Sequence, residues 1–437
     1  MHNNPRSREA IALKEVGQTD VVRAVSVGLI AVFMMLMASS ALVEILRPRG
    51  DGAVAWRPWT RVGSLATQIP PAIEVAVNEG LPAGNRRLHE AIDAFEDGLE
   101  DDSALIALVQ PRTQLLLTRW LGAGTEEVYP GASGWLFFRP DVDSLTGPAF
   151  LAPEVMSRRA RGGDQWASPP QPDPLLAIAE LKAQVEAAGA QLLVIPTPLK
   201  PAIHPEAFTG RFDGVSEPIR NPSEVEFAAG LREIGVVVFD PAEVMARDRA
   251  ETGETQFLRT DTHWTPRAVD LVSQELAEFI RSQYGLAPMM RLERREATAE
   301  NLGDIAVKLR LPAHQTLITP EAVRIQRVFG LDRQLWKPDA GADVLLLGDS
   351  FTNIYSTPEL GWGSAAGLAE QLSFHLGRPV DRLAVNAGGA YATREALRRA
   401  ADGDRGGLGG KRLVIYQFAN RELNGGDWKL FQPPPDS

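Results

Sequence analysis

From about residue 174 onward, short apolar runs alternate with segments of helical spacing. Runs of three or four apolar residues predict buried strands at 192–195, 236–239, 344–347, 383–385 and 413–416. Apolar residues three and four apart predict helices at 174–188, 223–234, 265–284, 364–377 and 392–401. Apolar strands that alternate with helices are typical of a parallel sheet covered on both faces. We therefore expect an α/β fold with a doubly wound, mostly parallel sheet.

The N-terminal region contains an uncharged stretch at 24–43, which begins after Arg23 and ends before Glu44. Its 20 residues match the length that a helix needs to cross the hydrocarbon layer of a membrane. More Lys and Arg precede the stretch than follow it, so we expect a transmembrane helix whose N-terminus lies inside the cell. A cleaved signal peptide with its cleavage site near Ser39, Ser40 and Ala41 is the alternative.

These patterns divide the chain into four predicted parts. They are a cytoplasmic tail at 1–23, a transmembrane anchor at 24–43, a membrane-proximal helical segment at 44–125 and an α/β domain at 126–437. Residues 139–173 are rich in Pro, Gly, Arg and Asp, which predicts an irregular surface segment. With this orientation we expect the protein at the bacterial inner membrane, with the α/β domain in the periplasm.

Composition narrows the classes of function. Of the 437 residues, 44% are hydrophobic and 23% are charged, which excludes a disordered chain. The net charge of −11 and the lack of basic runs argue against nucleic acid as a partner. The sequence has no cysteine, which excludes disulfides, thiolate nucleophiles and Cys-ligated metal centres.

The sequence Gly348-Asp349-Ser350 directly follows the predicted strand at 344–347. A strand that ends in Gly can turn sharply and lift the next side chains out of the sheet. Ser350 would then stand where a nucleophile is needed, with its own N–H free to donate to an oxyanion. A generic turn is the structural alternative, because Gly, Asp and Ser are all common in turns.

A second candidate sequence, Asp261-Thr262-His263, precedes the helix predicted to begin near residue 265. Residues i and i+2 of an extended segment point to the same side. Asp261 can therefore hold one ring nitrogen of His263 while the other nitrogen faces a substrate, as in a Ser–His–Asp system. The nearby helix N-terminus is expected to favour the neutral imidazole that a general base needs. A helix cap at Asp261 is the alternative.

A third candidate is the loop containing Gly388 and Gly389, which follows the predicted strand at 383–385. Backbone N–H groups of such a loop can approach a reacting carbonyl oxygen closely, although a plain turn is an open alternative. None of the six His lies in an HExxH motif or a close His pair, and we expect no metal and no cofactor. An Asp-x-His pair can nevertheless bind a metal, so a metallohydrolase is a further alternative.

The order of these motifs resembles that of a known family. The predicted anchor is followed by Gly-Trp-Leu-Phe at 134–137, by VIPTPLK at 194–200, by DTHW at 261–264 and by GDSF at 348–351. Over roughly 125–425 the chain resembles the SGNH-hydrolase-like alginate O-acetyltransferases of the AlgJ and AlgX type, and AlgJ more closely. In this type the Asp-x-His motif precedes the serine, as it does here, whereas ordinary SGNH hydrolases have the reverse order.

The resemblance implies a role for each candidate residue. Ser350 would be the nucleophile, His263 the general base and Asp261 its orienting partner. Gly388 or Gly389 would match the oxyanion glycine of the family.

Two further positions lie in the last predicted strand and the loop after it. Arg421 matches an arginine of the family and is a candidate for substrate binding, whereas Gln417 stands where the family has Glu. Four aromatic residues near the motifs are candidates for stacking on sugar rings, with a place in the core as the alternative: Trp264, Tyr355, Trp362 and Tyr391.

The resemblance implies a periplasmic O-acetyltransferase that moves an acetyl group through an acetyl-serine onto an exopolysaccharide such as alginate. A membrane-bound O-acyltransferase would deliver the acetyl group, and the anchor would hold the domain beside it. Two alternatives remain open. One is a polysaccharide acetylesterase that uses the same three residues. The other is a non-catalytic glycan-binding or scaffold subunit of an export complex.

Overall fold

The structure is a computed structural model that describes residues 23–46, 57–102, 104–162, 169–401 and 407–431. It divides into two compact units, Met1–Thr113 and Gln114–Ser437. The predicted cytoplasmic tail lies outside the described residues except for Arg23.

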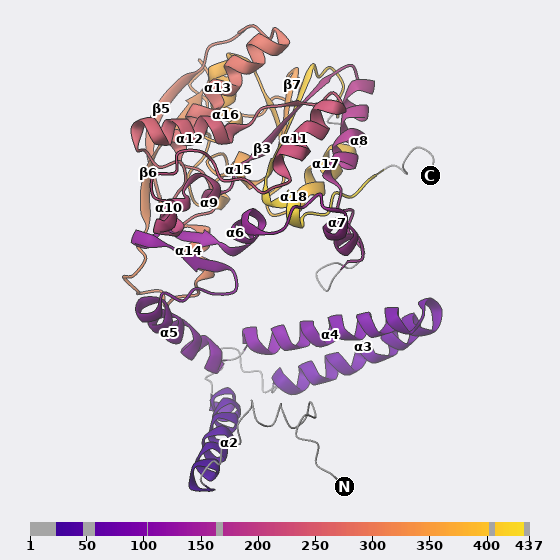
Figure 1. The fold of residues 1–437 in the computed structure, drawn as a ribbon, viewed down its shortest axis with the longest axis vertical. Helices are drawn as coiled ribbons and strands as arrows, with labels where there is room; N and C mark the ends of the chain where they lie inside the picture. The colour runs from indigo at the N-terminus through magenta and orange to yellow at the C-terminus, as the bar shows by residue number, and fades with distance from the viewer. Residues whose placement is uncertain (1–22, 47–56, 103, 163–168, 402–406, 432–437) are drawn as a thin grey trace, which may run out of the picture. The chain divides into compact units, whose positions relative to one another are not determined.

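The N-terminal unit consists of helices. They are α2 (Arg23–Leu46), α3 (Arg57–Glu79), α4 (Leu81–Asp102) and the beginning of α5 (Ala104–Leu121). Helices α3 and α4 pack side by side as a hairpin joined at Gly80 (Figure 1). Within the described residues, no helix meets the length and hydropathy that a membrane span requires. The anchor at 24–43 therefore stays a prediction.

A five-stranded parallel sheet forms the centre of the C-terminal unit. Its strands stand in the order β4 (Val237–Val238), β3 (Gln191–Thr197), β9 (Leu413–Ala419), β7 (Val344–Gly348) and β8 (Asp381–Ala384). Each of the five predicted strands is present. The parallel α/β sheet expected from the sequence is confirmed, and the carboxyl ends of β7, β8 and β9 lie at one edge.

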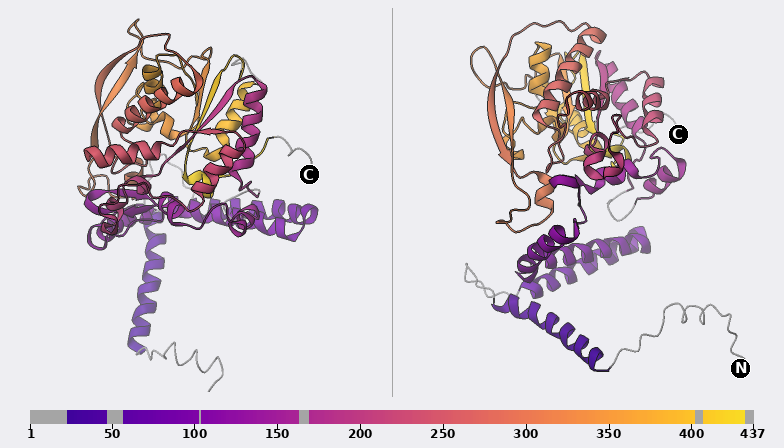
Figure 2. Two further views of the ribbon diagram at one scale, coloured as in Figure 1. Left: turned by 45° about the horizontal axis from the view of Figure 1, so that its top comes forward. Right: turned by 60° about the vertical axis from the view of Figure 1, so that its left-hand side comes forward.

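Helices cover both faces of this sheet, as Figures 1 and 2 show. One face packs against α12 (Pro241–Thr252), α13 (Pro266–Tyr284) and α16 (Leu368–Leu376). The other packs against α8 (Pro174–Ala187), α11 (Glu224–Glu233) and α17 (Gly389–Ala401). Successive side chains of a strand enter opposite layers, so that Leu346 belongs to the first core and Leu347 to the second. The fold is doubly wound, as predicted.

Two antiparallel hairpins and several short helices complete the unit. Strand β1 (Val128–Pro130) pairs with β2 (Leu136–Phe138), and β5 (Glu293–Asn301) pairs with β6 (Glu321–Phe329). The short helices are α6 (Arg139–Thr146), α7 (Pro153–Ala160), α9 (Lys200–Ile203), α10 (Pro205–Phe208), α14 (Asp304–Lys308), α15 (Ser350–Asn353) and α18 (Arg421–Gly425). Three 3₁₀ turns lie at Ala132–Gly134, Gly210–Phe212 and Pro358–Leu360.

The prediction of an irregular surface segment over 139–173 is wrong in part. Residues 139–146 and 153–160 form α6 and α7, and each helix has a proline in its first turn. Proline is favoured there because its fixed φ suits a helix start and the missing N–H has no partner to lose. Helix α6 also buries Asp141, Val142 and Leu145.

Candidate active site

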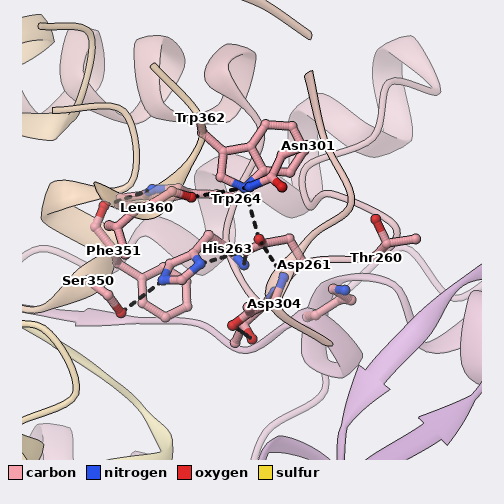
Figure 3. A network of polar contacts seen from close by, with 12 residues as sticks. Thr260, Asp261, His263, Trp264, Asn301, Asp304, Ser350, Phe351, Leu360 and Trp362 are labelled. Carbon is pink, nitrogen blue, oxygen red and sulfur yellow. Dashed lines mark hydrogen bonds and ion pairs between the residues drawn. The ribbon is translucent and has the colours of Figure 1, made fainter. Parts of the chain in front are cut away.

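The structure brings Asp261, His263 and Ser350 into one chain of hydrogen bonds (Figure 3). The Asp261 Oδ1 atom lies 2.6 Å from His263 Nδ1. The His263 Nε2 atom lies 2.8 Å from Ser350 Oγ, although the two residues are 87 positions apart. Asp261 and His263 are buried, with 2% and 5% exposed, whereas Ser350 is partly exposed. A nucleophile, a base and an orienting acid in this arrangement are suited to acyl transfer.

Ser350 stands at the turn from β7 into α15. Asp349 caps this short helix, because its Oδ1 accepts a hydrogen bond of 2.8 Å from Phe351 N. Its Oδ2 accepts a second bond of 2.9 Å from Ala419 N at the end of β9. The position before Asp349 requires glycine, because a Cβ atom on residue 348 would lie 2.1 Å from Thr352 Oγ1. The sharp strand-to-helix turn expected at Ser350 is therefore present. It continues from β7 and is hydrogen-bonded to the end of β9.

Gln417, which stands where the resemblance suggests Glu, cross-links this turn from β9. Its Oε1 accepts hydrogen bonds from Asp349 N at 3.1 Å and from Thr352 Oγ1 at 2.8 Å. Its Nε2 donates to Thr197 Oγ1 at 2.9 Å and to Asp349 Oδ1 at 3.0 Å. Because this position donates as well as accepts beside a carboxylate, an amide suits it better than an ionised acid does.

The second oxygen of Asp261 has its own partners. Its Oδ2 accepts hydrogen bonds from Trp362 Nε1 at 2.8 Å and from Asp304 N at 3.0 Å. Burial by itself would raise the pKa of Asp261, but the hydrogen bond and charge of His263 and the Trp362 bond hold that pKa well below its usual value. The carboxylate is therefore kept charged as the partner of the imidazole.

Asp261 also determines the electrostatics of His263. Burial alone would lower the pKa of His263, but the hydrogen bond and the charge of Asp261, with a smaller contribution from Asp304, raise it above its usual value. The expectation that the nearby helix N-terminus favours the neutral imidazole stays a prediction, and the adjacent carboxylate acts in the opposite direction.

Three charged residues support the 259–263 segment, and the sequence pattern gave no role to any of them. Asp304 accepts hydrogen bonds from Thr262 N at 2.7 Å and Thr262 Oγ1 at 2.6 Å. Glu321 Oε1 accepts from Thr260 N at 2.8 Å and from Thr260 Oγ1 at 2.6 Å. The fully buried Lys200 donates to the carbonyl oxygens of Leu136 and Arg259 at 2.8 and 3.3 Å. No residue type or spacing in the sequence indicates these long-range contacts.

The loop with the two candidate oxyanion glycines follows β8, the neighbour of β7. It is bonded on both sides of Ser350: Val385 N donates to Gly348 O at 3.0 Å, and Asn353 Nδ2 donates to Asn386 Oδ1 at 2.9 Å. Gly388 is half-buried and Gly389 is exposed. The structure thus places this loop beside the turn that carries the serine, while the oxyanion role of Gly388 and Gly389 stays a prediction.

Arg421 begins α18 and lies beside the same turn. Its Nη1 donates to Asp141 Oδ1 at 2.9 Å, and its guanidinium carbon lies 5.7 Å from the ring centroid of Phe351. Asp141 is only 1% exposed, whereas the Arg421 side chain is 20% exposed. The buried acid therefore holds a cation that still reaches solvent next to Ser350.

The prediction that Trp264 and Tyr355 stack on a sugar is wrong. Both side chains have no exposed surface. Trp264 Nε1 donates to Phe351 O at 3.0 Å, and Tyr355 Oη donates to Trp264 O at 2.7 Å, so the two rings join the His263 and Ser350 segments from inside the core. Trp362 is also fully buried, and Tyr391 alone of the four aromatic candidates is partly exposed.

Asp261, His263 and Asp304 also offer one potential metal-ligand atom each, all within 4.8 Å of one another. These potential ligand atoms already take part in hydrogen bonds within the protein, however. Both oxygens of Asp261 and both oxygens of Asp304 accept hydrogen bonds, and both ring nitrogens of His263 face hydrogen-bond partners. The residues fit a hydrogen-bonded triad better than a metal centre.

Comparison with known proteins shows which proteins this chain is similar to. A family model described as "SGNH hydrolase-like domain, acetyltransferase AlgX" matches residues 128–418. The curated protein "Probable alginate O-acetylase AlgJ" of Pseudomonas fluorescens is 27% identical over 181 residues, which are 39% of this chain and 44% of that protein. The match thus spans less than half the length of the curated relative.

One solved structure supports the fold. The O-acetyltransferase domain of Pseudomonas putida AlgJ is similar with a TM-score of 0.50 and 21% sequence identity, covering 69% of this chain and 93% of that one. At this identity the similarity concerns the fold alone.

Proposed function

The chain belongs to the family of SGNH hydrolase-like acetyltransferase domains of the AlgX type, and from this premise we propose that it transfers acetyl groups to hydroxyl groups of a polysaccharide. One observation carries the proposal: His263 stands between Asp261 and Ser350 with contacts of 2.6 and 2.8 Å. Alginate is the proposed substrate, because the curated relative is described as an alginate O-acetylase.

The first half-reaction loads the serine. His263 Nε2 takes the proton of Ser350 Oγ as that oxygen forms a bond to the carbonyl carbon of an acetyl donor. The bond between the carbonyl carbon and the leaving group then breaks, and the imidazolium returns its proton to the leaving group. Acetyl-Ser350 and neutral His263 remain. Asp261 stays ionised throughout and stabilises the imidazolium through Nδ1.

The second half-reaction releases the acetyl group to the sugar. A sugar hydroxyl gives its proton to His263 Nε2 and attacks the acetyl carbonyl carbon, and the proton then returns to Ser350 Oγ as the ester bond to the serine breaks. The Ser350 N–H has no hydrogen-bond partner among the residues that the structure describes, so it is available to the oxyanion. We propose Gly388 or Gly389 as the source of a second donor.

Arg421 is the proposed binding group for the polysaccharide. A uronic-acid polymer carries one carboxylate per sugar, and a guanidinium binds a carboxylate through charge-assisted hydrogen bonds. Arg421 lies against Phe351 and is fixed there by Asp141, which supports a role in placing such a sugar beside Ser350.

The compartment and the donor are also proposals. We propose that the apolar segment 24–43 anchors the chain in the bacterial inner membrane with the catalytic domain in the periplasm, and that a membrane-bound O-acyltransferase supplies the acetyl group. Fusion of a periplasm-dependent reporter enzyme after residue 437 tests the orientation. An active reporter supports the periplasmic location, and an inactive but stable fusion contradicts it.

The reaction is tested with the full chain, a p-nitrophenyl acetate donor and mannuronate oligosaccharides. We expect acetylated oligosaccharide by mass spectrometry, and an acetylated peptide containing Ser350 after a rapid acid quench. Ser350→Ala should fold and lose at least about 10⁴-fold in rate, because the covalent route is removed. Free acetate without acetylated sugar would support an esterase instead. A folded wild-type chain that forms neither product would support a scaffold.

A further inference from the structure

We propose that Asp304 is a positioning residue of this site, which fixes the Asp261–His263 segment by hydrogen bonds and adds a second negative charge beside the imidazole. The kinetic part of this inference rests on the proposed function, whereas the electrostatic part concerns His263 alone. Asp304 lies 41 positions after His263, at the start of α14 between β5 and β6, where no spacing rule connects it with the other residues.

Three hydrogen bonds join Asp304 to the segment. Its Oδ1 accepts from Thr262 N at 2.7 Å, and its Oδ2 accepts from Thr262 Oγ1 at 2.6 Å. Its own N–H donates to Asp261 Oδ2 at 3.0 Å. Thr262 lies between Asp261 and His263 in the sequence, so a carboxylate that binds Thr262 at two points fixes the backbone that carries both side chains.

The backbone around Asp304 is fitted to the same segment. Ala306 N, in the first turn of α14, donates to Thr260 O at 3.1 Å. Gly303 has φ of +92°, and a Cβ at this position would lie 2.4 Å from Thr260 O. Asp304 can therefore approach the segment only because a glycine precedes it, and the contact is built into the local backbone rather than made by a mobile surface side chain.

Charge adds to this geometry. His263 becomes an imidazolium in each half of the proposed reaction, and a second carboxylate near it favours that form. The charged neighbours of His263 are Asp261 and Asp304, which raise its pKa, and Arg421, which opposes them. Burial and the nearby Asp261 charge raise the pKa of Asp304 itself. Asp304 therefore exerts its full negative charge on His263 only at pH values above that raised pKa.

The experiment compares Asp304→Asn, Asp304→Ala and Asp173→Asn in the full chain. Asn keeps the size of the side chain and can still accept from Thr262 N and donate to Thr262 Oγ1, so that variant removes charge with little loss of packing. Asp173 is a matched control, because it caps α8 through Leu175 N at 2.9 Å and has no contact with the triad among the described residues. The readouts are the His263 pKa from NMR titration of its ring signals, the rate of labelling of Ser350 by a sulfonyl fluoride, and kcat/KM.

We expect Asp304→Asn to lower the pKa of His263, because the variant removes a negative charge near the imidazole. We expect Asp304→Ala to reduce kcat/KM about 100-fold, because a small displacement of the general base strongly reduces the rate. Asp173→Asn should leave all three readouts unchanged. If Asp304→Ala does not fold, Thr262→Val removes one of the same bonds from the other side and should also slow labelling. An unchanged His263 pKa in Asp304→Asn, or a folded Asp304→Ala with wild-type labelling and kcat/KM, overturns the proposal. If the wild-type chain transfers no acetyl group, the proposed function fails while the NMR titration still decides the role of Asp304.

Discussion

Trp362 Nε1 donates a hydrogen bond of 2.8 Å to Asp261 Oδ2, the carboxylate oxygen that does not face His263 Nδ1. The indole comes from a segment 101 residues away and is fully buried. The acid of the triad is therefore bound at both oxygens, and its orientation does not depend on the histidine alone.

Trp362→Phe should weaken catalysis more than it weakens the fold. Loss of a bond to a buried carboxylate costs about 1.5–3 kcal/mol, which corresponds to a roughly 10- to 100-fold lower kcat/KM if the loss is felt in the transition state. The control is Trp428→Phe, which removes an indole bond of 3.0 Å to Glu422 O in the other core. Denaturant unfolding should show a lower unfolding free energy in both variants. Kinetic assays should show a lower kcat/KM only in Trp362→Phe. Equal kcat/KM in the two variants would contradict this.

The activity should have an acidic limb determined by His263. The base must be neutral, and the charge of Asp261 outweighs burial and raises the pKa of His263 above 6.5. The half-maximal kcat/KM on the acid side should therefore lie above pH 6.5, with activity lost as the pH falls below that pKa. Asp261→Asn should move this midpoint to lower pH and reduce kcat about 10⁴-fold. A wild-type midpoint below pH 6.5 would be inconsistent with the geometry.

Gln417→Glu should destabilise the chain at neutral pH. The introduced carboxylate would replace the Nε2 donor that lies 3.0 Å from Asp349 Oδ1 and 2.9 Å from Thr197 Oγ1. Repulsion and a lost hydrogen bond should lower the unfolding free energy by about 1–3 kcal/mol. Burial and the Asp349 charge would raise the pKa of the new acid, so the penalty is present above that pKa and decreases as the pH falls. Urea unfolding at pH 7 and pH 5 measures the difference, and an equal loss at both values would contradict the charge argument.

Lys200 should make stability rise with pH in the alkaline range. Burial lowers its pKa from 10.5 to about 8, although Asp261 and three further acids oppose the change. Between these two pKa values the unfolded chain binds more protons than the folded chain does, so the unfolding free energy rises with pH from about 8 to 10.5. We expect urea unfolding at pH 7.5 and pH 10 to show a larger increase in unfolding free energy with pH for the wild type than for Lys200→Met. Lys182→Met on α8 reports the general effect of losing a lysine, and an identical pH trend in the two variants would refute the expectation.

Much of the fold could be read from the sequence because its signals are local. The strand at Val344–Gly348 is a run of apolar residues, and Thr265 and Pro266 mark the start of α13 where the structure has it. Asp261 and His263 are likewise only two positions apart, but they lie in a bend, where His263 N donates to Asp261 Oδ1 at 3.1 Å, and not in the extended segment that the sequence predicted. The turn at Ser350 follows from Gly348.

The remaining features depend on contacts that no local pattern contains. Trp264 and Ser350 both belong to the motifs, yet Trp264 is buried and Ser350 is partly exposed. Trp264 Nε1 donates to Phe351 O, which lies 87 positions away, and no local pattern contains that contact. The sequence does not distinguish Asp304 from other aspartates, and its contact with Thr262 depends on the close approach of Gly303 to Thr260. The motifs therefore predicted which residues meet at the site, whereas the prediction that Trp264 and Tyr355 stack on a sugar failed because residue type does not reveal burial.

The origin of the three triad residues has a consequence for how this protein can be assayed. His263 belongs to a segment held to β2 by the hydrogen bond between Leu136 N and Arg259 O, and Ser350 belongs to a turn held to β9 through Ala419 N. We therefore expect an activated serine only after these distant parts of the chain have come together. In a refolding sample, a sulfonyl fluoride should consequently label native molecules and not collapsed or partly assembled ones. The amount of labelled protein then measures the native fraction.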